Sequence, residues 1–253
     1  MRKRSRILLV VLLVAGLGGR AWQVLRPREP NYQGKPLSYW LGKSVGMGAA
    51  AVRQTGTNAI PTLLRMLRAR DSAFFLRLVA LAQRQHVVKI EYTTAAERHR
   101  QAMLGFLFLN DGAKEAVPAL MEIYEHGVSM SSRADTALAL GFVGPVASPA
   151  VPLLLPGVNH TNHSIRMASI QALGGIHAEP ALVVPVLLKL LGKGDPEVRT
   201  KAAEGLRQFG TDAKIAAPIL LPFLNDPDLS VRTEATNVLK RIDPDAAAKA
   251  GVK

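Results

Sequence analysis

The chain has 253 residues, 48% of them hydrophobic and only 5% aromatic, with a formal net charge of +13. It contains no cysteine, which excludes a disulfide framework, a thiol nucleophile, a cysteine metal site and lipid attachment through cysteine. Residues 1–30 hold seven of the 32 basic residues and one acidic residue, so almost half of the positive excess belongs to the N-terminal segment. The remainder is a modest basic bias, and we do not expect nucleic acid as a partner.

The N-terminus carries a targeting signal. Basic residues at 2–6 precede an uncharged, apolar run at 7–19, which suits a signal-peptide core and is shorter than the ~20 residues that span a bilayer. Apolar character resumes after Arg20, so residues 7–25 form a longer candidate membrane segment, and no clear small-x-small cleavage site is present. We predict that residues 1–28 are an uncleaved signal anchor. The bulk of the chain would then be extracytoplasmic, in the periplasm. The alternative is a cleaved signal peptide and a secreted protein.

A linker and a capping helix are predicted for residues 29–44. Prolines and charges over residues 26–36 favour extended chain. The Leu-Ser-Tyr-Trp-Leu segment at 37–41 follows, and we interpret it as a short helix that covers the apolar face of the first repeat. Trp40 has an alternative role as a platform for a ligand.

Residues 45–112 predict irregular repeats. A first helix is expected at 59–67 and a second at 73–86, with Asp71 as its N-cap. An extra segment around residues 86–94 interrupts the period described below. It is either a binding loop or an inert connection.

A period of 33 residues organises the rest of the chain. Arginine recurs at this step at Arg100, Arg133, Arg166, Arg199 and Arg232. Leucine follows seven residues after each, at Leu107, Leu140, Leu173, Leu206 and Leu239. Proline repeats at Pro152, Pro185 and Pro218, with Pro118 displaced by one. A constant period of this size predicts a stack of near-identical units, with the leucines in its core.

One unit shows how the repeat is built. Pro185 lies near the start of an apolar helix, and the glycines and proline of residues 192–196 end that helix. Asp195 is the predicted N-cap of a second helix at 197–209, and Gly210 is its C-terminal stop. The unit is therefore helix A, a tight turn and helix B. We predict B helices at 97–109, 132–143, 164–176, 197–209 and 230–242, the regular array covering residues 113–243 and a C-terminal tail at 244–253.

The turn and helix B sequences resemble a known repeat family. The run Asp-Pro-Glu-Val-Arg-Thr-Lys-Ala-Ala-Glu-Gly-Leu from Asp195, and Asp-Pro-Asp-Leu-Ser-Val-Arg-Thr-Glu-Ala from Asp226, resemble HEAT repeats. The short repeat is most similar to the HEAT-like subgroup named after phycobilisome lyases. The resemblance is strong over 113–243 and weaker over 45–112, and the linker and cap resemble the start of bacterial membrane-anchored HEAT proteins. It implies a right-handed all-α solenoid, in which the repeated arginines bond turn carbonyls. A functional basic stripe is the alternative for the arginines.

Catalytic and metal-binding patterns are poor. The histidines, His86, His99, His126, His160, His163 and His177, form no His-Glu-x-x-His motif. The pair His160 and His163 lacks a nearby carboxylate, so exposed turn residues are the favoured interpretation over a metal site. No glycine-rich phosphate loop or nucleophile-elbow motif is present. We predict no catalytic, metal or cofactor site.

The predicted function is a membrane-tethered scaffold that binds a protein or peptide along its concave face. The alternative is a HEAT-like lyase or an accessory subunit of an enzyme, which rests on analogy of fold alone. A DNA-binding HEAT-like protein is a third class, against which the export signal argues.

A candidate binding surface follows from helix periodicity. Positions three, six and ten after residue 132, and their equivalents one period on, lie opposite the buried stripe of each B helix. The candidate partner-binding residues are Asp135, Leu138, Phe142, Lys201, Glu204, Gln208 and Arg241, with Ala168, Gln171, Gly175, Glu234 and Asn237 on the same grid. Leu138 and Phe142 beside Asp135 would anchor a partner side chain. The alternative is that the neighbouring repeat or the inserted segment covers them.

Overall fold

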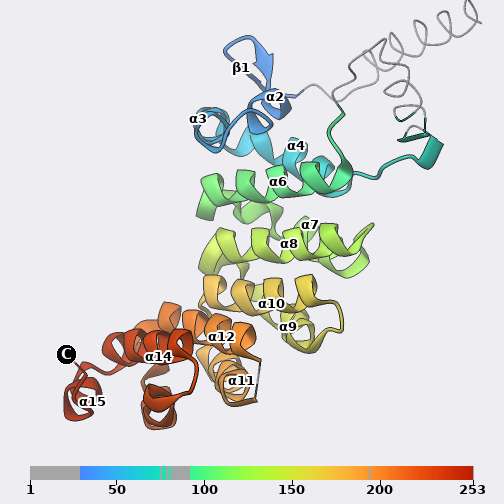
Figure 1. The fold of residues 1–253 in the computed structure, drawn as a ribbon. Helices are drawn as coiled ribbons and strands as arrows, with labels where there is room; N and C mark the ends of the chain where they lie inside the picture. Colours follow the sequence, from blue (N-terminus) through green and yellow to red (C-terminus); the bar gives the residue numbers. More distant parts are fainter. Residues whose placement is uncertain (1–28, 75, 78–79, 81–91, 194, 253) are drawn as a thin grey trace, which may run out of the picture.

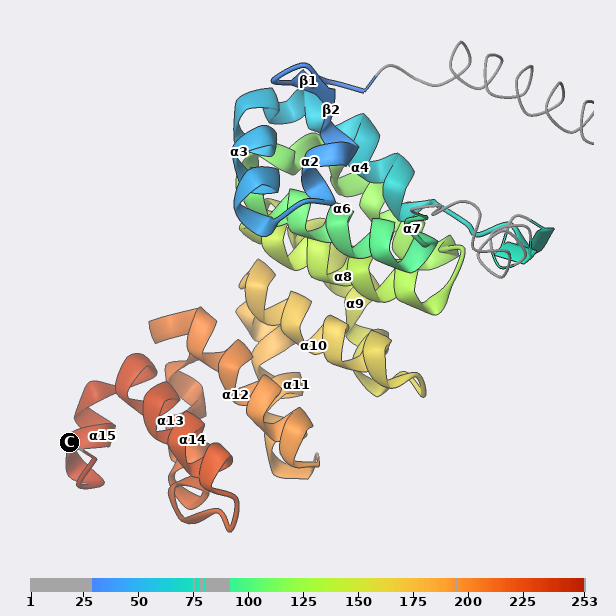
Figure 2. The same cartoon turned by 45° about the horizontal axis from the view of Figure 1, so that its top comes forward.

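The computed structural model describes residues 29–252 except 75, 78–79, 81–91 and 194. Apart from one short β-hairpin, the described elements are helices, and successive helical hairpins stack into an elongated, curved array (Figures 1 and 2). The chain is therefore an all-α solenoid, as its period predicts. The predicted anchor at residues 7–25 lies outside the described residues.

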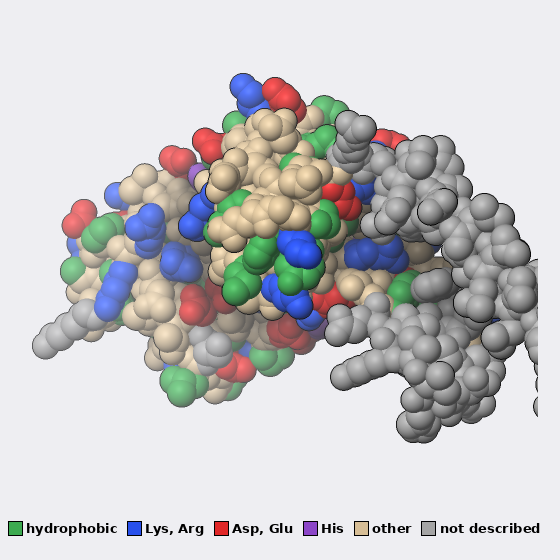
Figure 3. Space-filling model, turned by 90° about the horizontal axis from the view of Figure 1, so that it is seen from above, with side chains coloured by type: hydrophobic (Ala, Val, Ile, Leu, Met, Phe, Trp, Pro, Cys, Tyr) green, Lys and Arg blue, Asp and Glu red, His purple; other side chains and the backbone are tan. Residues whose placement is uncertain are grey.

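The first end of the stack is a cap built from a hairpin and two helices. Strands β1 (Asn31–Tyr32) and β2 (Lys35–Pro36) pair antiparallel, and helices α2 (Leu37–Leu41) and α3 (Val45–Thr55) follow. Helix α2 forms where the capping helix is predicted, with Leu37 and Leu41 buried. The Trp40 indole N–H donates to the Tyr32 carbonyl at 2.8 Å, so Trp40 ties the helix to the hairpin. Seen from above, this end carries exposed hydrophobic and basic side chains (Figure 3).

Five A helices and five B helices make up the described array. The A helices are α4 (Ile60–Leu67), α7 (Val117–His126), α9 (Val151–Leu154) continued by η4 (Leu155–Asn159), α11 (Pro180–Lys193), and α13 (Ala217–Leu220) continued by η6 (Leu221–Asn225). The B helices are α6 (Ala95–Leu109), α8 (Met130–Val143), α10 (His163–Ile176), α12 (Pro196–Phe209) and α14 (Leu229–Ile242). Each B helix starts and ends within two residues of its predicted bounds.

Short 3-10 segments connect the repeats. They are η1 (Gly56–Ala59), η2 (Asn110–Ala116), η3 (Gly144–Ala150) and η5 (Gly210–Ala216), and helix α15 (Pro244–Lys249) ends the array within the predicted tail. Each B helix packs on the next, so that α6, α8 and α10 lie one below another before the array turns toward α12 and α14 (Figure 1).

Helix ends follow the predicted capping chemistry. The Asp195 carboxylate accepts from the Val198 N–H at 2.9 Å, and Asn162 caps α10 in the same way through the Ile165 N–H at 3.2 Å. Gly210 ends α12 with a φ of 54°, in the left-handed region that glycine adopts without strain. The predicted helix at 73–86 lies largely outside the described residues.

One helical stretch within the described residues, Met130–Asn159, is long and apolar enough to cross a membrane by length and composition alone. It combines α8, η3, α9 and η4, and half of its most apolar window is buried inside the stack. Core helices of proteins pass the same test. We therefore assign this stretch to the core.

The leucine ladder holds in four of five repeats. Leu140, Leu173, Leu206 and Leu239 are fully buried, whereas Leu107 is 41% exposed, so the prediction of a core role for Leu107 is wrong. Phe106 fills the equivalent buried place, 34 residues before Leu140. The step is longer here because the α7–α8 turn holds one more residue than the α9–α10 turn.

The arginine ladder shifts in the same way. Arg100 is exposed and pairs with Glu97 on its own helix, so it is not a rung of the ladder. The position 34 residues before Arg133 is His99, whose Nε2–H donates to the Ala69 carbonyl at 2.9 Å. Burial lowers the pKa of His99, which keeps this imidazole neutral.

The remaining rungs are structural, as the favoured interpretation predicts. Arg133 donates to the Tyr124 carbonyl at 2.8 Å, Arg166 to His160 at 2.9 Å and Arg232 to Asp226 at 2.7 Å. Arg199 donates to the Asp226 carboxylate of the next repeat at 3.3 Å. Three of these arginines tie a B helix to the turn before it, and Arg199 also joins adjacent repeats.

Candidate binding groove

The B helices α8, α10 and α12 line a groove of about 270 Å³. Five of the seven predicted binding residues contribute to its walls, namely Leu138, Phe142, Lys201, Glu204 and Gln208. Asp135 and Arg241 do not line it. The residues that helical spacing placed on one face are thus brought together by the stacking of three repeats.

The floor of the groove consists of closely packed backbone. A Cβ atom added at Gly174 would lie 2.6 Å from the Gly205 Cα, and one at Gly175 would lie 2.7 Å from the Gly141 carbonyl oxygen. A Cβ at Gly141 would meet the Ala172 Cα at 2.8 Å. These approaches exclude side chains between the helices. The floor is therefore shallow and formed by small residues, while larger side chains rise on both sides of it.

One wall is apolar. Leu138 and Phe142 are half-buried, so they are neither covered completely nor fully presented to solvent. Leu104 and Phe108 occupy the equivalent positions of α6 and are half-buried too. The sequence analysis missed this second pair because it applied a 33-residue step where the step is 34. The repeated Leu-x-x-x-Phe spacing at 104–108 and 138–142 is the signal that could have revealed it.

The opposite wall is polar. The Lys201 ammonium and the Glu204 carboxylate form an ion pair at 2.7 Å on α12, which neutralises both charges. Gln171 and Gln208 are exposed and offer amide donors and acceptors. Arg207 lies in the last turn of α12, and no carboxylate of the described residues lies within 4.0 Å of its guanidinium. The groove thus combines apolar contact with hydrogen-bonding groups, as binding surfaces for protein segments do.

A larger but shallower hollow of about 510 Å³ lies on the A-helix side, between α7 and η3. Apolar side chains such as Met121 and Val146 line it together with Glu122, which already pairs with Arg68 at 2.8 Å. We regard it as an open depression between neighbouring A helices. The groove on the B-helix side is the more enclosed of the two and gathers the predicted residues.

Asp135 lies at the edge of the B-helix surface, on α8. Burial raises its pKa to about 6, while Arg100 lowers the pKa and Glu97 raises it. The folded chain thus keeps this proton to a higher pH than the unfolded chain, whose pKa is near 3.8. Stability contributed by Asp135 therefore decreases as the pH rises from about 4 to 6, because unfolding releases the proton in that window.

We expect Asp135→Asn to raise the free energy of unfolding at pH 7.5 by on the order of 1–3 kcal/mol, because it removes a buried charge. At pH 4 the effect should nearly vanish, since the carboxyl is then protonated in the folded protein. Thermal melts at both pH values measure it, with Asp111→Asn in an exposed turn as the control. Equal effects at the two pH values would contradict the burial of an ionised carboxylate.

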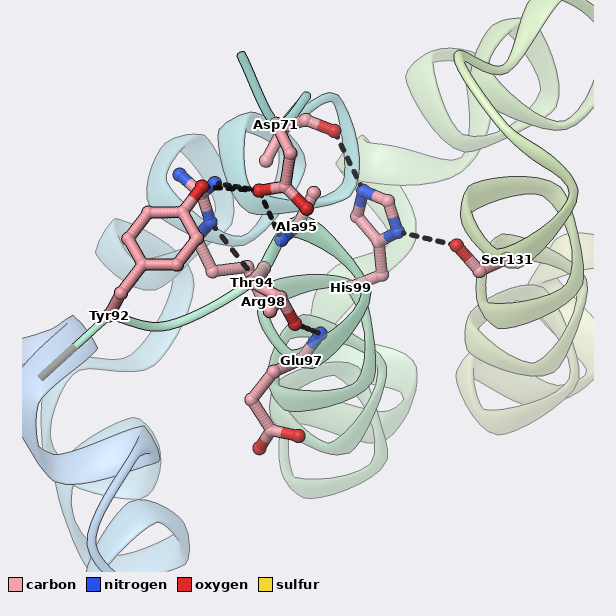
Figure 4. Close-up of polar contacts among 9 residues, drawn as sticks. Asp71, Tyr92, Thr94, Ala95, Glu97, Arg98, His99 and Ser131 are labelled. Atoms are coloured by element: carbon pink, nitrogen blue, oxygen red, sulfur yellow. Dashed lines mark hydrogen bonds and ion pairs between the residues drawn. The ribbon is translucent and has the colours of Figure 1, made fainter. Parts of the chain in front are cut away.

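A second polar cluster joins the two ends of the irregular segment (Figure 4). The Asp71 carboxylate accepts from the Tyr92 hydroxyl, from the Ala95 N–H at 2.8 Å and from Arg98 at 3.3 Å. Burial acts to raise the pKa of Asp71, but these three donors outweigh it and hold the pKa below its usual value. The hydrogen bond from Tyr92 in turn raises the pKa of that phenol.

The Asp71 cluster is a structural brace. Asp71 is the predicted cap of the helix after it, and here its carboxylate satisfies the first turn of α6. His99 extends the brace to α8, because Ser131 donates to its Nδ1 at 3.1 Å (Figure 4). The cluster closes the connection between α4 and α6 and leaves α6 fixed against α8. This is how the apolar pair of α6 comes to lie beside that of α8.

Histidine positions match the interpretation as turn residues. His160 accepts from the Asn162 N–H through Nδ1 at 2.9 Å, inside the turn before α10. His163 is exposed and lies 3.5 Å from the Glu197 carboxylate. Within the described part of the chain, no group of three or more His, Asp or Glu side chains is placed to hold a metal ion.

Comparison with known proteins supports the repeat assignment for the C-terminal repeats. Residues 184–250 match the family model described as HEAT repeats. The match covers less than half of the chain, and it does not distinguish the phycobilisome-lyase subgroup. A designed armadillo repeat protein, solved in complex with the peptide (KR)4, is similar at 13% identity and a TM-score of 0.47, covering 82% of this chain and 98% of that one. No curated protein matches the chain.

Proposed function

We propose that the protein is a membrane-tethered scaffold that binds an extended segment of a partner protein in the groove between α8, α10 and α12. The observation that carries the proposal is the groove itself, where half-exposed Leu138 and Phe142 face polar side chains of α12 across a floor of backbone. Stacked helical repeats are typical of interaction scaffolds because they present long continuous surfaces.

Phe142 is the expected energetic centre of this interaction. Aromatic side chains at the centre of a binding surface commonly carry much of the binding energy. We expect Phe142→Ala to reduce capture of the partner about 10-fold or more, which corresponds to ~1.4 kcal/mol. The tagged full-length protein would be captured from detergent-solubilised membranes, and the co-purifying proteins quantified by mass spectrometry.

The control is Leu182→Ala, which removes an apolar side chain that is 48% exposed on the A helix α11. It should leave capture unchanged, and both variants should melt close to the wild-type temperature. A loss of stability above ~2 kcal/mol for Phe142→Ala would identify a core residue and would remove the basis for a hot spot.

The tether rests on the composition of residues 7–25, an apolar segment interrupted by a single arginine. We propose that this segment stays in the bilayer and that the repeats are extracytoplasmic. A reporter enzyme that is active only after export, fused after Lys253, should be active, and the protein should resist extraction from membranes by alkaline carbonate. A reporter active only in the cytoplasm would reverse the proposed orientation, and a mature N-terminus near residue 22 would indicate cleavage.

A further inference from the structure

The positive charge of this chain is concentrated beside the proposed membrane segment. Residues 30–70, which follow it directly, hold six Lys and Arg residues and no Asp or Glu. Residues 71–253 hold 19 basic and 18 acidic residues, so the rest of the array is nearly neutral. An unbalanced positive charge of this kind is attracted to a surface of anionic lipid headgroups.

The structure shows which of these charges are free. Arg65 pairs with Glu29 and Arg68 with Glu122, both at 2.8 Å. Lys35 and Lys43 are exposed and form no ion pair within the described residues; their ammonium groups lie 5.8 Å and 5.0 Å from the centre of the Tyr39 ring. The uncompensated lysines therefore lie together, on the hairpin and after α2.

Large apolar side chains are exposed on the same cap. Tyr39 is 42% exposed, Val45 61% and Met47 51%, although each lies within or at the start of a helix that buries its other face. Viewed from above, hydrophobic and basic side chains adjoin on this end of the stack (Figure 3). A tyrosine with neighbouring lysines and small apolar side chains has the composition of a membrane-interface surface.

Covalent geometry places this surface near the bilayer. The predicted membrane segment ends at residue 25, and the cap begins at Glu29. Even a fully extended chain spans only about 14 Å between these residues. That reach is less than twice the Debye length of about 8 Å at physiological salt, so the lysines of the cap lie within the electrostatic range of the headgroups.

We propose that the cap, residues 30–55, is a second membrane contact that lies on anionic lipid headgroups, with Lys35 and Lys43 at the charges and Tyr39, Val45 and Met47 at the interface. The inference rests on the proposed tether and holds for either orientation of the anchor. Two contacts, one on each side of a short linker, restrict how the stack can tilt. The solenoid axis would then point away from the bilayer, with the groove held at a distance from it.

The absence of cysteine makes a direct test simple, because a single label can be placed at will. Met47→Cys, labelled with the environment-sensitive dye NBD, would be compared with Ile215→Cys, a site 77% exposed near the other end of the stack. The full chain would be reconstituted into phosphatidylcholine vesicles with and without phosphatidylglycerol. Vesicle flotation reports the tether, while dye emission and quenching by spin-labelled lipid report the contact.

We expect the dye at position 47 to shift to shorter wavelength and to be quenched in vesicles with phosphatidylglycerol, while the dye at position 215 stays aqueous. Adding Lys35→Glu with Lys43→Glu should return the first dye toward its aqueous emission without loss of flotation. Lys189→Glu on α11 is the matched charge control and should change neither.

Failure of each proposal gives its own result. A protein that floats with the vesicles while its position-47 dye stays aqueous overturns the membrane contact and leaves the tether intact. A protein that does not float overturns the tether and the contact with it. Quenching that is equal at positions 47 and 215 also overturns the contact, because the cap would then have no special position.

Discussion

Leu206→Ala is expected to lower the free energy of unfolding by roughly 2–5 kcal/mol. Leu206 is fully buried in α12, in the ladder that Leu173 and Leu239 continue in the neighbouring repeats. Truncation removes buried apolar surface and leaves a cavity between layers that closely packed helices cannot fill by moving together. The same substitution at Leu173 and Leu239 should have a similar cost, measured by urea unfolding followed by circular dichroism.

Leu107→Ala is the matched control, because it makes the same chemical change at a position 41% exposed. Its cost should stay below ~0.5 kcal/mol. A cost below ~1 kcal/mol at all three ladder positions would show that the buried face of the B helices has been assigned incorrectly. A large cost at Leu107 would contradict the 34-residue step between α6 and α8.

Gly174→Ala is expected to destabilise the array by about 1–3 kcal/mol, although alanine has the better helix propensity. The added Cβ would lie 2.6 Å from the Gly205 Cα, and backbone cannot yield there as a flexible side chain would. Helices α10 and α12 would have to separate, which also opens the floor of the binding groove. Thermal unfolding measures the first effect, and partner capture should fall with it.

The control for this substitution is Gly46→Ala in α3, where no atom lies within 4 Å of the added Cβ. There the better helix propensity should prevail and stabilise the protein by up to ~1 kcal/mol. Opposite signs at the two positions distinguish close helix packing from intrinsic propensity. A stabilising Gly174→Ala would mean that the α10–α12 approach is looser than the structure indicates.

Local chemistry determined the helical elements from sequence alone. Asp195 and Gly210 bound α12 as predicted, because capping and left-handed stops depend on residues within one turn of the helix end. The five B helices likewise follow from hydrophobic periodicity, which reflects the side of each helix that must be buried. The period then predicts the stack, since each unit alone leaves an apolar face uncovered.

Register between repeats could not be determined in the same way. Arg100 and Leu107 continue the 33-residue ladder by coincidence, and nothing in their own neighbourhood marks them as surface residues. Only the packing of α6 on α8 shows that His99 and Phe106 occupy those places, because the length of the intervening turn decides which side chain meets the core. The apolar pair Leu104 and Phe108 was overlooked for this reason.

The groove combines both kinds of information. Helical spacing by itself placed Leu138 and Phe142 on one face of α8, and Lys201, Glu204 and Gln208 on the same face of α12. Whether three helices would approach closely enough to join those faces was decided by tertiary contacts, above all by the meeting of Gly174 with Gly205 and of Gly175 with Gly141. Sequence determines which side chains a helix presents, whereas the distance between helices depends on residues far apart in the chain. That distance turns separate faces into one surface.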